Sequence, residues 1–436
     1  MSKKQGASDR RDFIKTSTMA AAGGIALNAV LPAGAYAQGS DEIRVGVVGC
    51  GGRGSGAAHN VLNSARNVTI HAVADAFESQ AKGLQARLKG IAKDDPKVKE
   101  LNNKVEIADD KVHSGIDAYQ KIMNDPKINY VILATPPGFR SIHIMAAVKA
   151  KKNIFTEKPV CVDGPTARDC MAAYDEANAS GLGIVAGTQR RHQAAYIETI
   201  KQLHEGAIGD IVGGRCYWNQ GILWSRDKKP GMTPAEAQLN NWYNYTYLCG
   251  DHIVEQHVHN IDVMNWVLRG HPIKAVGMGH RTRNDPKYGI IFDFFSIDFE
   301  YQNGVHVHSM CRQISNCANS VSEAVVGTKG SCQVNTYTIN GKAVVAKNQQ
   351  RGVDPYVQEH TDLIESIRAG KPLNELKTVT ESSLTAVLGR MSAYTGKEIS
   401  WEQALNSKQR LMPENFNKDT VLPEWTVAVP GKTQLI

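Results

Sequence analysis

The sequence predicts a two-part α/β protein: a parallel sheet with helices on both faces, followed by an α+β half with an open, mixed, mostly antiparallel sheet. Three observations lead to this prediction. At 436 residues the chain is too long for one core, which suggests two or three domains. Up to residue 188, short apolar runs alternate with helical patterns, and beyond it several runs follow a period of two. We therefore expect the two folded parts to span residues 41–188 and 189–436.

Composition excludes several classes of protein. The chain is 42% hydrophobic and 21% charged, which is typical of a globular protein and not of a disordered or fibrous one. The formal net charge is +7, but residues 1–37 contribute +3 of it, which leaves +4 for the rest. No dense stripe of lysine or arginine gathers this charge, so we predict no nucleic-acid binding.

Residues 1–37 resemble a signal for twin-arginine export rather than a folded element. Arg10-Arg11 precedes a weakly apolar run over Met19–Leu31 and then Ala35-Tyr36-Ala37, which has the small-residue pattern of a cleavage site. The apolar run is shorter than the ~20 residues needed to span a bilayer. We expect export of the folded protein, cleavage after Ala37, a periplasmic location and no membrane anchor. The alternative is a chance arginine pair before an anchor helix.

A glycine-rich motif follows an apolar strand at Arg44–Val48. The motif, Gly49-Cys50-Gly51-Gly52-Arg53-Gly54, matches G-x-G-x-x-G, and a helical pattern continues over Ser55–Ala65. In such a motif the first glycine makes a tight turn, the second lets the backbone approach a pyrophosphate, and the third allows close packing of helix on strand. The phosphates then lie at the helix N-terminus. The predicted cofactor-binding residues here are Gly49, Gly51, Gly52, Arg53 and Gly54.

The next strand ends in an acidic residue at the spacing that this motif requires. Val68–Ala74 is apolar and leads into Asp75, which lies 21 residues beyond Gly54. A carboxylate at this place accepts hydrogen bonds from the adenosine ribose and repels a 2′-phosphate. These residues predict a Rossmann domain over 41–188 that binds NAD, with NADP as the alternative cofactor. The other interpretation is a glycine-rich turn in a sheet that binds no nucleotide.

Two further loops are expected at the same edge of the sheet. Tyr130–Ala134 has the pattern of a buried strand and leads into Thr135-Pro136, and an amphipathic helix follows over Ser141–Lys151. The strand Asn153–Thr156 then leads into Glu157-Lys158-Pro159. In open α/β sheets, ligands bind outside the carboxyl ends of the strands, where both loops lie.

In this order the motifs resemble the Gfo/Idh/MocA family, which is named for glucose-fructose oxidoreductase and inositol dehydrogenase. The resemblance extends over nearly all of the chain beyond residue 37 and includes the turn Glu205-Gly206-x-x-Gly209 before a new sheet. It implies a homodimer or homotetramer and a cis peptide bond before Pro159. The cofactor contacts that it implies are Thr135, Pro136, Glu157 and Lys158.

The resemblance also implies a catalytic role for Lys158. Its ammonium would touch both the nicotinamide ribose and the substrate hydroxyl, where a fixed positive charge stabilises the developing alkoxide. The alternative is a surface lysine that precedes a helix.

A second group of polar residues lies in Gly250–Trp266. On a helix, His252, Glu255, His259 and Asp262 share one arc, and apolar residues occupy the opposite side. The pattern predicts a buried helix with a polar stripe. Family members carry Asp-x-x-x-His with a second Asp three residues later, and here these positions hold Glu255, His259 and Asp262.

The resemblance implies that these three residues act on the substrate. A neutral imidazole at His259 suits a general base that takes the hydroxyl proton, and the carboxylate of Glu255 would fix its tautomer. Glu in place of Asp leaves the role of Glu255 open. Asp262 is an expected substrate contact, and the alternative for His259 is a structural histidine of the core.

We predict no metal site and no obligatory disulfide. Seven residues, or ~10 Å of helix, separate His252 from His259, and His257 points away from His259, so neither pair can chelate one ion without distant help. The eight cysteines include no CxxC pair and no zinc-ligand spacing.

The second half is predicted to bind substrate and to form oligomers. Its strand candidates are Ile211–Trp218, Lys274–Gly279, Phe292–Tyr301, Val305–Cys311 and Glu323–Gly327, and residues 355–396 have a helical pattern. Trp218–Tyr247 is rich in aromatic and amide residues, and its Trp224 suits stacking on a sugar. The alternative is a loop packed on its own domain. Arg190, in the turn after the strand Ile184–Gly187, is the other expected substrate contact.

Two enzymatic functions remain open. The first is an NAD(P)-dependent oxidoreductase that acts on a secondary CH–OH of a sugar, glycoside or cyclitol and retains its nucleotide tightly. Tight retention follows from export, because free NAD is not expected to be plentiful outside the cytoplasm. The second is an NAD-dependent glycoside hydrolase that works by transient oxidation and elimination; secreted glycosidases of this fold typically replace the lysine found here as Lys158, which favours the oxidoreductase. A third, non-enzymatic possibility is a sugar sensor that retains its cofactor.

Overall fold

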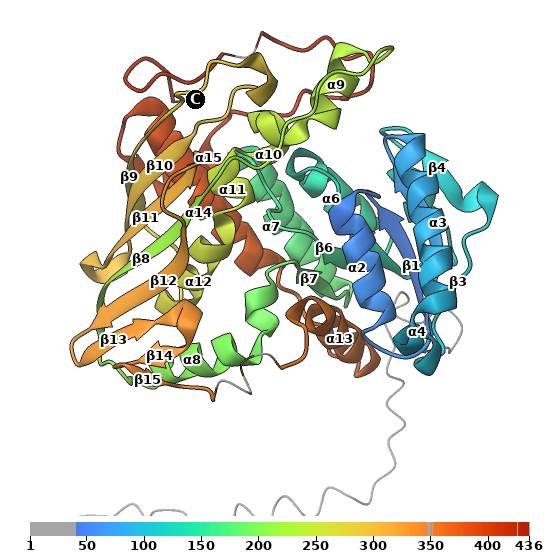
Figure 1. The fold of residues 1–436 in the computed structure, drawn as a ribbon, viewed down its shortest axis with the longest axis horizontal. Helices are drawn as coiled ribbons and strands as arrows, with labels where there is room; N and C mark the ends of the chain where they lie inside the picture. Colours follow the sequence, from blue (N-terminus) through green and yellow to red (C-terminus); the bar gives the residue numbers. More distant parts are fainter. Residues whose placement is uncertain (1–40, 347–349, 351, 425, 436) are drawn as a thin grey trace, which may run out of the picture. The chain divides into compact units, whose positions relative to one another are not determined.

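The computed structural model describes residues 41–346, 350, 352–424 and 426–435. The export signal predicted over residues 1–37, with its cleavage after Ala37, lies outside these residues. The described chain is built on two sheets, one of seven strands and one of nine (Figure 1). The first sheet ends at Ala186 and the second begins at Ile211.

The first sheet is parallel, with the strand order β3-β2-β1-β5-β6-β7 and with β4 paired to β2. Its strands are β1 (Ile43–Val48), β2 (Val68–Asp75), β3 (Lys104–Val105), β4 (Val112–Ser114), β5 (Tyr130–Leu133), β6 (Asn153–Thr156) and β7 (Ile184–Ala186). The helices between them are α2 (Gly52–Leu62), α3 (Glu78–Asp94), α4 (Pro96–Glu100), α5 (Tyr119–Met123), α6 (Arg140–Lys149) and α7 (Gly164–Ala179). Strand order reverses beside β1, and this is the crevice at which open α/β sheets bind ligands. The predicted Rossmann architecture is confirmed.

Apolar strands explain why helices cover both faces of this sheet. Every residue of β1 except Arg44 is buried, and so are the first seven residues of β2. A strand that is apolar on both sides must bury both against helices. Two hydrophobic clusters result, one on each face of the sheet.

Two helices from far along the chain complete these clusters. Leu363, Ile364 and Ile367 of α13 (Pro355–Arg368) join the cluster that contains α2, and Leu376 and Val379 of α14 (Leu376–Thr395) join the other. The packing therefore crosses the division that the sequence predicts at residue 189. The apolar faces of α13 and of the first turns of α14 find their partners in the first core, to which both segments belong.

The second sheet is mixed, with the strand order β15-β14-β13-β12-β8-β11-β10-β9-β16. Its strands are β8 (Ile211–Gln220), β9 (Lys274–His280), β10 (Phe294–Glu300), β11 (His306–Gln313), β12 (Ser320–Gly327), β13 (Gly330–Gln333), β14 (Thr338–Ile339), β15 (Lys342–Ala343) and β16 (Ile399–Ser400). The pair β8 and β11 is parallel, and the other described pairs are antiparallel. The remaining helices are α8 (Ala194–His204), α9 (Pro234–Asn240), α10 (Thr246–Cys249), α11 (His252–Glu255), α12 (Val258–Leu268) and α15 (Trp401–Asn406).

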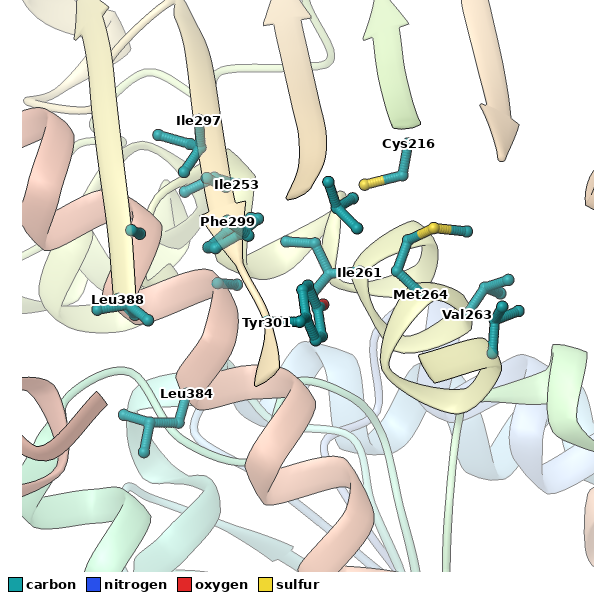
Figure 2. Packing of buried hydrophobic residues seen from close by; sticks show 14 of the residues in the cluster. Cys216, Ile253, Ile261, Val263, Met264, Ile297, Phe299, Tyr301, Leu384 and Leu388 are labelled. Atoms are coloured by element: carbon teal, nitrogen blue, oxygen red, sulfur yellow. The ribbon is translucent and has the colours of Figure 1, made fainter. Parts of the chain in front are cut away.

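One face of the second sheet packs on α12 and α14 (Figure 1). Burial alternates along β10 and β11, as expected for strands with one face on a core. Figure 2 shows part of this core, in which Phe299 of β10, Ile261 of α12 and Leu388 of α14 lie between the sheet and the helices. All five strands predicted for the second half are present.

The predicted continuous helix over Gly250–Trp266 is wrong. α11 ends at Glu255 and α12 begins at Val258. Between them the imidazole of His257 is fully buried and its Nε2 lies 2.7 Å from the hydroxyl oxygen of Ser309 on β11. The polar residues before the break and after it therefore belong to two short helices and not to one.

Two further properties concern the described part of the chain. None of its helices combines the length and the apolar character that crossing a bilayer requires. All eight cysteines are described and none is in a disulfide; Cys317 is exposed and the others are buried.

Candidate functional site

The glycine loop between β1 and α2 is shaped by close backbone contacts at two of its glycines. Gly49 has a φ of +94°, and a Cβ there would lie 2.6 Å from the carbonyl carbon of Ala134. A Cβ on Gly54 would lie 1.8 Å from the carbonyl oxygen of Gly49. In contrast, a Cβ on Gly51 or Gly52 would meet no atom within 4 Å. The first and third glycines of the motif thus close the turn, and the middle ones leave open space at the N-terminus of α2.

Asp75 ends β2 beside this loop. Its carboxylate accepts hydrogen bonds from the backbone N–H of Cys50, at 2.7 Å, and of Phe77, at 2.8 Å. Burial raises the pKa of Asp75, and these two hydrogen bonds oppose the rise. The backbone therefore holds the carboxylate at the mouth of the open space.

Two adjoining cavities extend from the glycine loop. The smaller, of about 110 Å³, is lined by Gly49, Gly51, Asp75 and Thr135, among others. The larger, of about 880 Å³, shares Phe77, Ile116 and Phe139 with it. Open space at Gly51 and Gly52, an acid at the strand end and two adjoining cavities fit a dinucleotide whose pyrophosphate lies over Gly51 and whose adenosine ribose lies at Asp75.

Arg53, the one charged residue of the motif, is held by Glu157, which follows β6. Its guanidinium donates to Oε1 of Glu157, with 3.0 Å from Nε, and lies 4.9 Å from the ring centre of Tyr356. Behind this pair lies Glu359 of α13, whose carboxylate is buried and has no hydrogen-bond partner among the described residues. Burial, and then the charge of Glu157, raise the pKa of Glu359 well above its ordinary value. Sequence analysis did not single out Tyr356 or Glu359, because only the fold brings α13 to this loop.

Arg140 joins the two other loops of the site. Its guanidinium is buried and donates to the carbonyl oxygens of Thr135 and Glu157, and lies 3.4 Å from the hydroxyl of Thr156. Burial lowers the pKa of Arg140 to about 10, while Glu157 and Glu255 oppose this, so that it stays protonated at neutral pH. A single cation therefore holds the Thr135-Pro136 loop against the Glu157-Lys158-Pro159 loop. Sequence analysis missed Arg140. The signal that could have found it is a charged residue at the start of a helix in a buried layer.

Lys158 crosses from the first half of the chain to the second. The peptide bond between Lys158 and Pro159 is cis, which confirms the expectation from the family resemblance. The ammonium donates to the carbonyl oxygen of Glu255 and lies 3.1 Å from its Oε1. Both side chains are about one tenth exposed. The interpretation of Lys158 as a surface lysine is wrong, because the ion pair with α11 buries it.

His259 lies in the first turn of α12. Its ring is partly exposed and stacks on Trp218 of β8, with 5.8 Å between ring centres. Burial lowers the pKa of His259 well below its ordinary value, and the cations Lys158, Arg190 and Arg53 lower it further. The imidazole is therefore neutral at pH 7, as a proton acceptor must be.

Glu255 does not orient His259 as the sequence predicts. No described hydrogen bond joins the two side chains; Lys158 and the side-chain amide of Gln256 hold the carboxylate instead. The two residues lie on different helices, Glu255 on α11 and His259 on α12. Glu255 positions the ammonium of Lys158.

Of the predicted substrate contacts, Arg190 and Asp262 lie near His259 but are paired. Arg191 binds both oxygens of Asp262, at 2.8 and 2.9 Å, and the hydroxyl of Ser382 donates to Oδ1 at 2.7 Å. Arg190 donates to the buried carboxylate of Glu323 at 2.7 Å. The contacts of Asp262 join α12 to α14 and to the turn after β7, and the pair of Arg190 and Glu323 joins that turn to β12. Contact of Arg190 or Asp262 with substrate stays a prediction.

Trp224 packs within its own segment. Its ring lies 5.6 Å from Trp242 and 5.5 Å from Tyr243, and Arg226 lies 4.8 Å from its centre. Trp242 and Arg226 line the smaller cavity by the glycine loop. The alternative of a loop packed on its own domain describes this segment, and a contact of Trp224 with sugar stays a prediction. Within the described ranges no group of three or more His, Cys, Asp or Glu residues is arranged to hold a metal ion.

Comparisons with known proteins agree with this geometry. A family profile described as "Oxidoreductase family, NAD-binding Rossmann fold" matches residues 43–188, and one described as "GFO/IDH/MocA C-terminal domain" matches residues 197–333. Among curated relatives, the scyllo-inositol 2-dehydrogenase (NAD(+)) of Bacillus subtilis strain 168 is 24% identical over 345 residues, which are 76% of this chain and 87% of the relative.

Two solved structures illustrate the shared fold. The scyllo-inositol dehydrogenase of Lactobacillus casei with bound NAD(H) and scyllo-inositol has a TM-score of 0.59 at 17% identity, over 83% of this chain and 99% of that chain. The aldose-aldose oxidoreductase of Caulobacter crescentus has a TM-score of 0.60 at 16% identity, over 82% and 99%. The two family profiles match successive segments and together cover more than half of the chain: the protein belongs to the Gfo/Idh/MocA family of oxidoreductases.

Proposed function

We propose that the protein oxidises a secondary alcohol of a sugar or cyclitol with NAD as hydride acceptor. The observation that carries this proposal is a pair of groups. Glu255 holds the ammonium of Lys158, and this ammonium is near enough to the neutral, partly exposed His259 to help lower its pKa. The names of the relatives, two of which are inositol dehydrogenases and one an aldose oxidoreductase, support a polyol or sugar substrate.

Each residue has a distinct part in this chemistry. NAD, when bound, accepts the hydride from the carbon that carries the hydroxyl. His259 takes the hydroxyl proton, because its imidazole is neutral near pH 7. The Lys158 ammonium stabilises the negative charge that develops on the oxygen as the C–H bond breaks. Arg140 holds the backbone next to Lys158 by binding the carbonyl oxygen of Glu157, and Glu255 fixes the ammonium at the end of the Lys158 side chain.

We further propose that NAD, and not NADP, is retained through many turnovers. The carboxylate of Asp75, which the Cys50 N–H holds at the end of β2, supports this choice, because an acid at this place of the motif accepts hydrogen bonds from the adenosine ribose and would repel a 2′-phosphate. Export through the predicted signal at Arg10-Arg11, with cleavage after Ala37, would remove the protein from the cytoplasmic pool of nucleotide. A second substrate would then have to reoxidise, in place, the NADH that forms when the first substrate is oxidised. Lys158 and the dehydrogenase relatives favour this oxidation over glycoside hydrolysis.

A substrate panel tests the proposed reaction. Loaded with NAD, the purified protein is incubated with cyclitols, free sugars and aryl glycosides while reduced nicotinamide and released aglycone are both followed. We expect reduced nicotinamide and a keto product from at least one polyol or sugar, without aglycone. Release of aglycone with no net reduction would instead support the hydrolase, and no reaction with any compound would contradict both.

Replacement of Lys158 tests its role in charge stabilisation. Lys158→Ala should fold and bind NAD but lose about a hundredfold or more in kcat, since one electrostatic group at a developing oxyanion contributes ~3 kcal/mol. Lys149→Ala, which removes an exposed lysine of α6, is the matched control and should leave kcat unchanged. Near-normal kcat in Lys158→Ala would remove the ammonium from the mechanism.

The pH dependence of kcat/KM tests His259 as the base. Protonation disables a base, and the pKa of His259 is lowered, so activity should stay constant at neutral pH and fall only below the ordinary histidine value of 6.5. His259→Asn should lower kcat by ~10²–10⁴-fold and abolish this acid limb. His271→Asn, at a histidine that stacks on Trp401, is the control. An acid limb that persists in His259→Asn would assign the proton to another group.

A further inference from the structure

The nucleotide cleft has a second wall that does not come from the Rossmann domain. Arg226, Leu239, Asn240 and Trp242 line the smaller cavity opposite the glycine loop. In the larger cavity, Leu239 is joined by Met412 and Phe416 from the segment after α15. These residues belong to two segments, 226–242 and 410–418, which we name the cover segments.

Side-chain packing fixes the cover segments over the Rossmann domain. Phe416 meets the ring of Phe139 edge-on at 5.6 Å, and Leu239 and Met412 belong to the same buried cluster. Phe139 lies directly after the Thr135-Pro136 loop. The apolar side chains of the cover segments therefore face the end of the cleft beyond Asp75.

Hydrogen bonds tie the two cover segments to each other and to the first half of the chain. The hydroxyl of Thr233, which caps α9, donates to the carbonyl oxygen of Lys418 at 2.6 Å. The backbone N–H of Leu411 donates to Asp163 at 2.7 Å. Arg410 forms an ion pair with Asp169 at 3.0 Å. The cover segments are thus joined to each other and are anchored to α7 and its N-cap at residues 410 and 411.

Charge in the smaller cavity is carried by two residues that line it, Asp75 and Arg226. Arg226 is the one arginine or lysine among the described residues that line it. Its guanidinium lies over Trp224 and its Nη1 is 3.4 Å from the carbonyl oxygen of Asn240, so that it is held without a carboxylate. Arg53, the cation on the Rossmann side, is already paired with Glu157. A pyrophosphate over Gly51 carries two negative charges and would meet Arg226 across the cleft.

We propose that the cover segments are the second half of the dinucleotide site and bind its ADP moiety. Arg226 binds the pyrophosphate, and Leu239, Met412 and Phe416 cover the adenine, which lies beyond the ribose at Asp75. Bound NAD is then enclosed between two walls, and its release requires the cover segments to separate from the Rossmann domain. This inference rests on the proposed binding of NAD and gives retention a structural cause.

Nucleotide binding by the full chain tests the proposal without relying on turnover. Arg226→Gln and Phe416→Ala are compared with wild type and with two controls, Arg66→Gln and Val421→Ala, at exposed positions. Affinities are measured for NAD, for ADP-ribose and for nicotinamide mononucleotide, and the release of bound NADH is followed by its fluorescence during a chase with NAD.

We expect both variants to weaken NAD and ADP-ribose by about tenfold or more and to speed NADH release similarly, because each loses a charge-assisted contact or a buried ring. The affinity for nicotinamide mononucleotide and both controls should be unchanged. Arg226→Gln should also reduce the salt dependence of ADP-ribose binding, whereas Phe416→Ala should not.

Two results would overturn the proposal. The first is wild-type affinity and release rates in both variants while the wild type binds NAD tightly, which would leave the proposed function intact. The second is equal weakening of nicotinamide mononucleotide and ADP-ribose, since contacts to the ADP moiety cannot produce it. Failure of the wild type to bind any of the three ligands would contradict the proposed function as well.

Discussion

The site depends on the contact between Lys158 and Glu255. One residue follows β6 of the parallel sheet and the other ends α11 in the second half of the chain. The ammonium reaches both the backbone carbonyl and the carboxylate of Glu255, in surroundings that exclude most water. A buried charge without a partner is costly, so the two halves are held in the one arrangement that pairs them. His259 follows Glu255 by four residues, at the start of α12.

Cations determine the chemistry that this arrangement can perform. Arg140 joins two loops of the site. Three other cations, Lys158, Arg190 and Arg53, lie close enough to His259 to lower its pKa. Burial, and then these positive charges, keep the imidazole neutral and ready to accept a proton, and the charges also favour an alkoxide. One set of charges therefore serves both the base and the oxygen that loses its proton. The acids Glu157, Glu255 and Asp262 are each paired with one of the neighbouring basic residues, which limits the net charge to be buried.

Local patterns predicted the parts of the site that are local. The glycine loop, Asp75 and five strands of each sheet follow from runs of a few residues, in which periodicity and spacing carry the information. The short strands β3, β4 and β13 to β16 have no such run and were not predicted. The contacts that sequence analysis missed join distant positions. Arg140 binds the carbonyl of Glu157 after β6, and His257 before α12 contacts Ser309. Glu359 reaches the site only because α13 packs on the first core. The aromatic segment around Trp224 was interpreted from composition alone, which could not show that Trp242 and Arg226 line the nucleotide cleft.

Transfer of hydrogen from substrate carbon to bound nucleotide tests the central claim most directly. The protein is loaded with NAD, freed of excess nucleotide, and mixed in a single turnover with a substrate identified by the panel, deuterated at the carbon that is oxidised. The nucleotide is then released by denaturation and weighed by mass spectrometry. Our account predicts one deuterium on the nicotinamide of the bound nucleotide and slower reduction than with the unlabelled substrate. Formation of keto product with no deuterium on the nucleotide would contradict it.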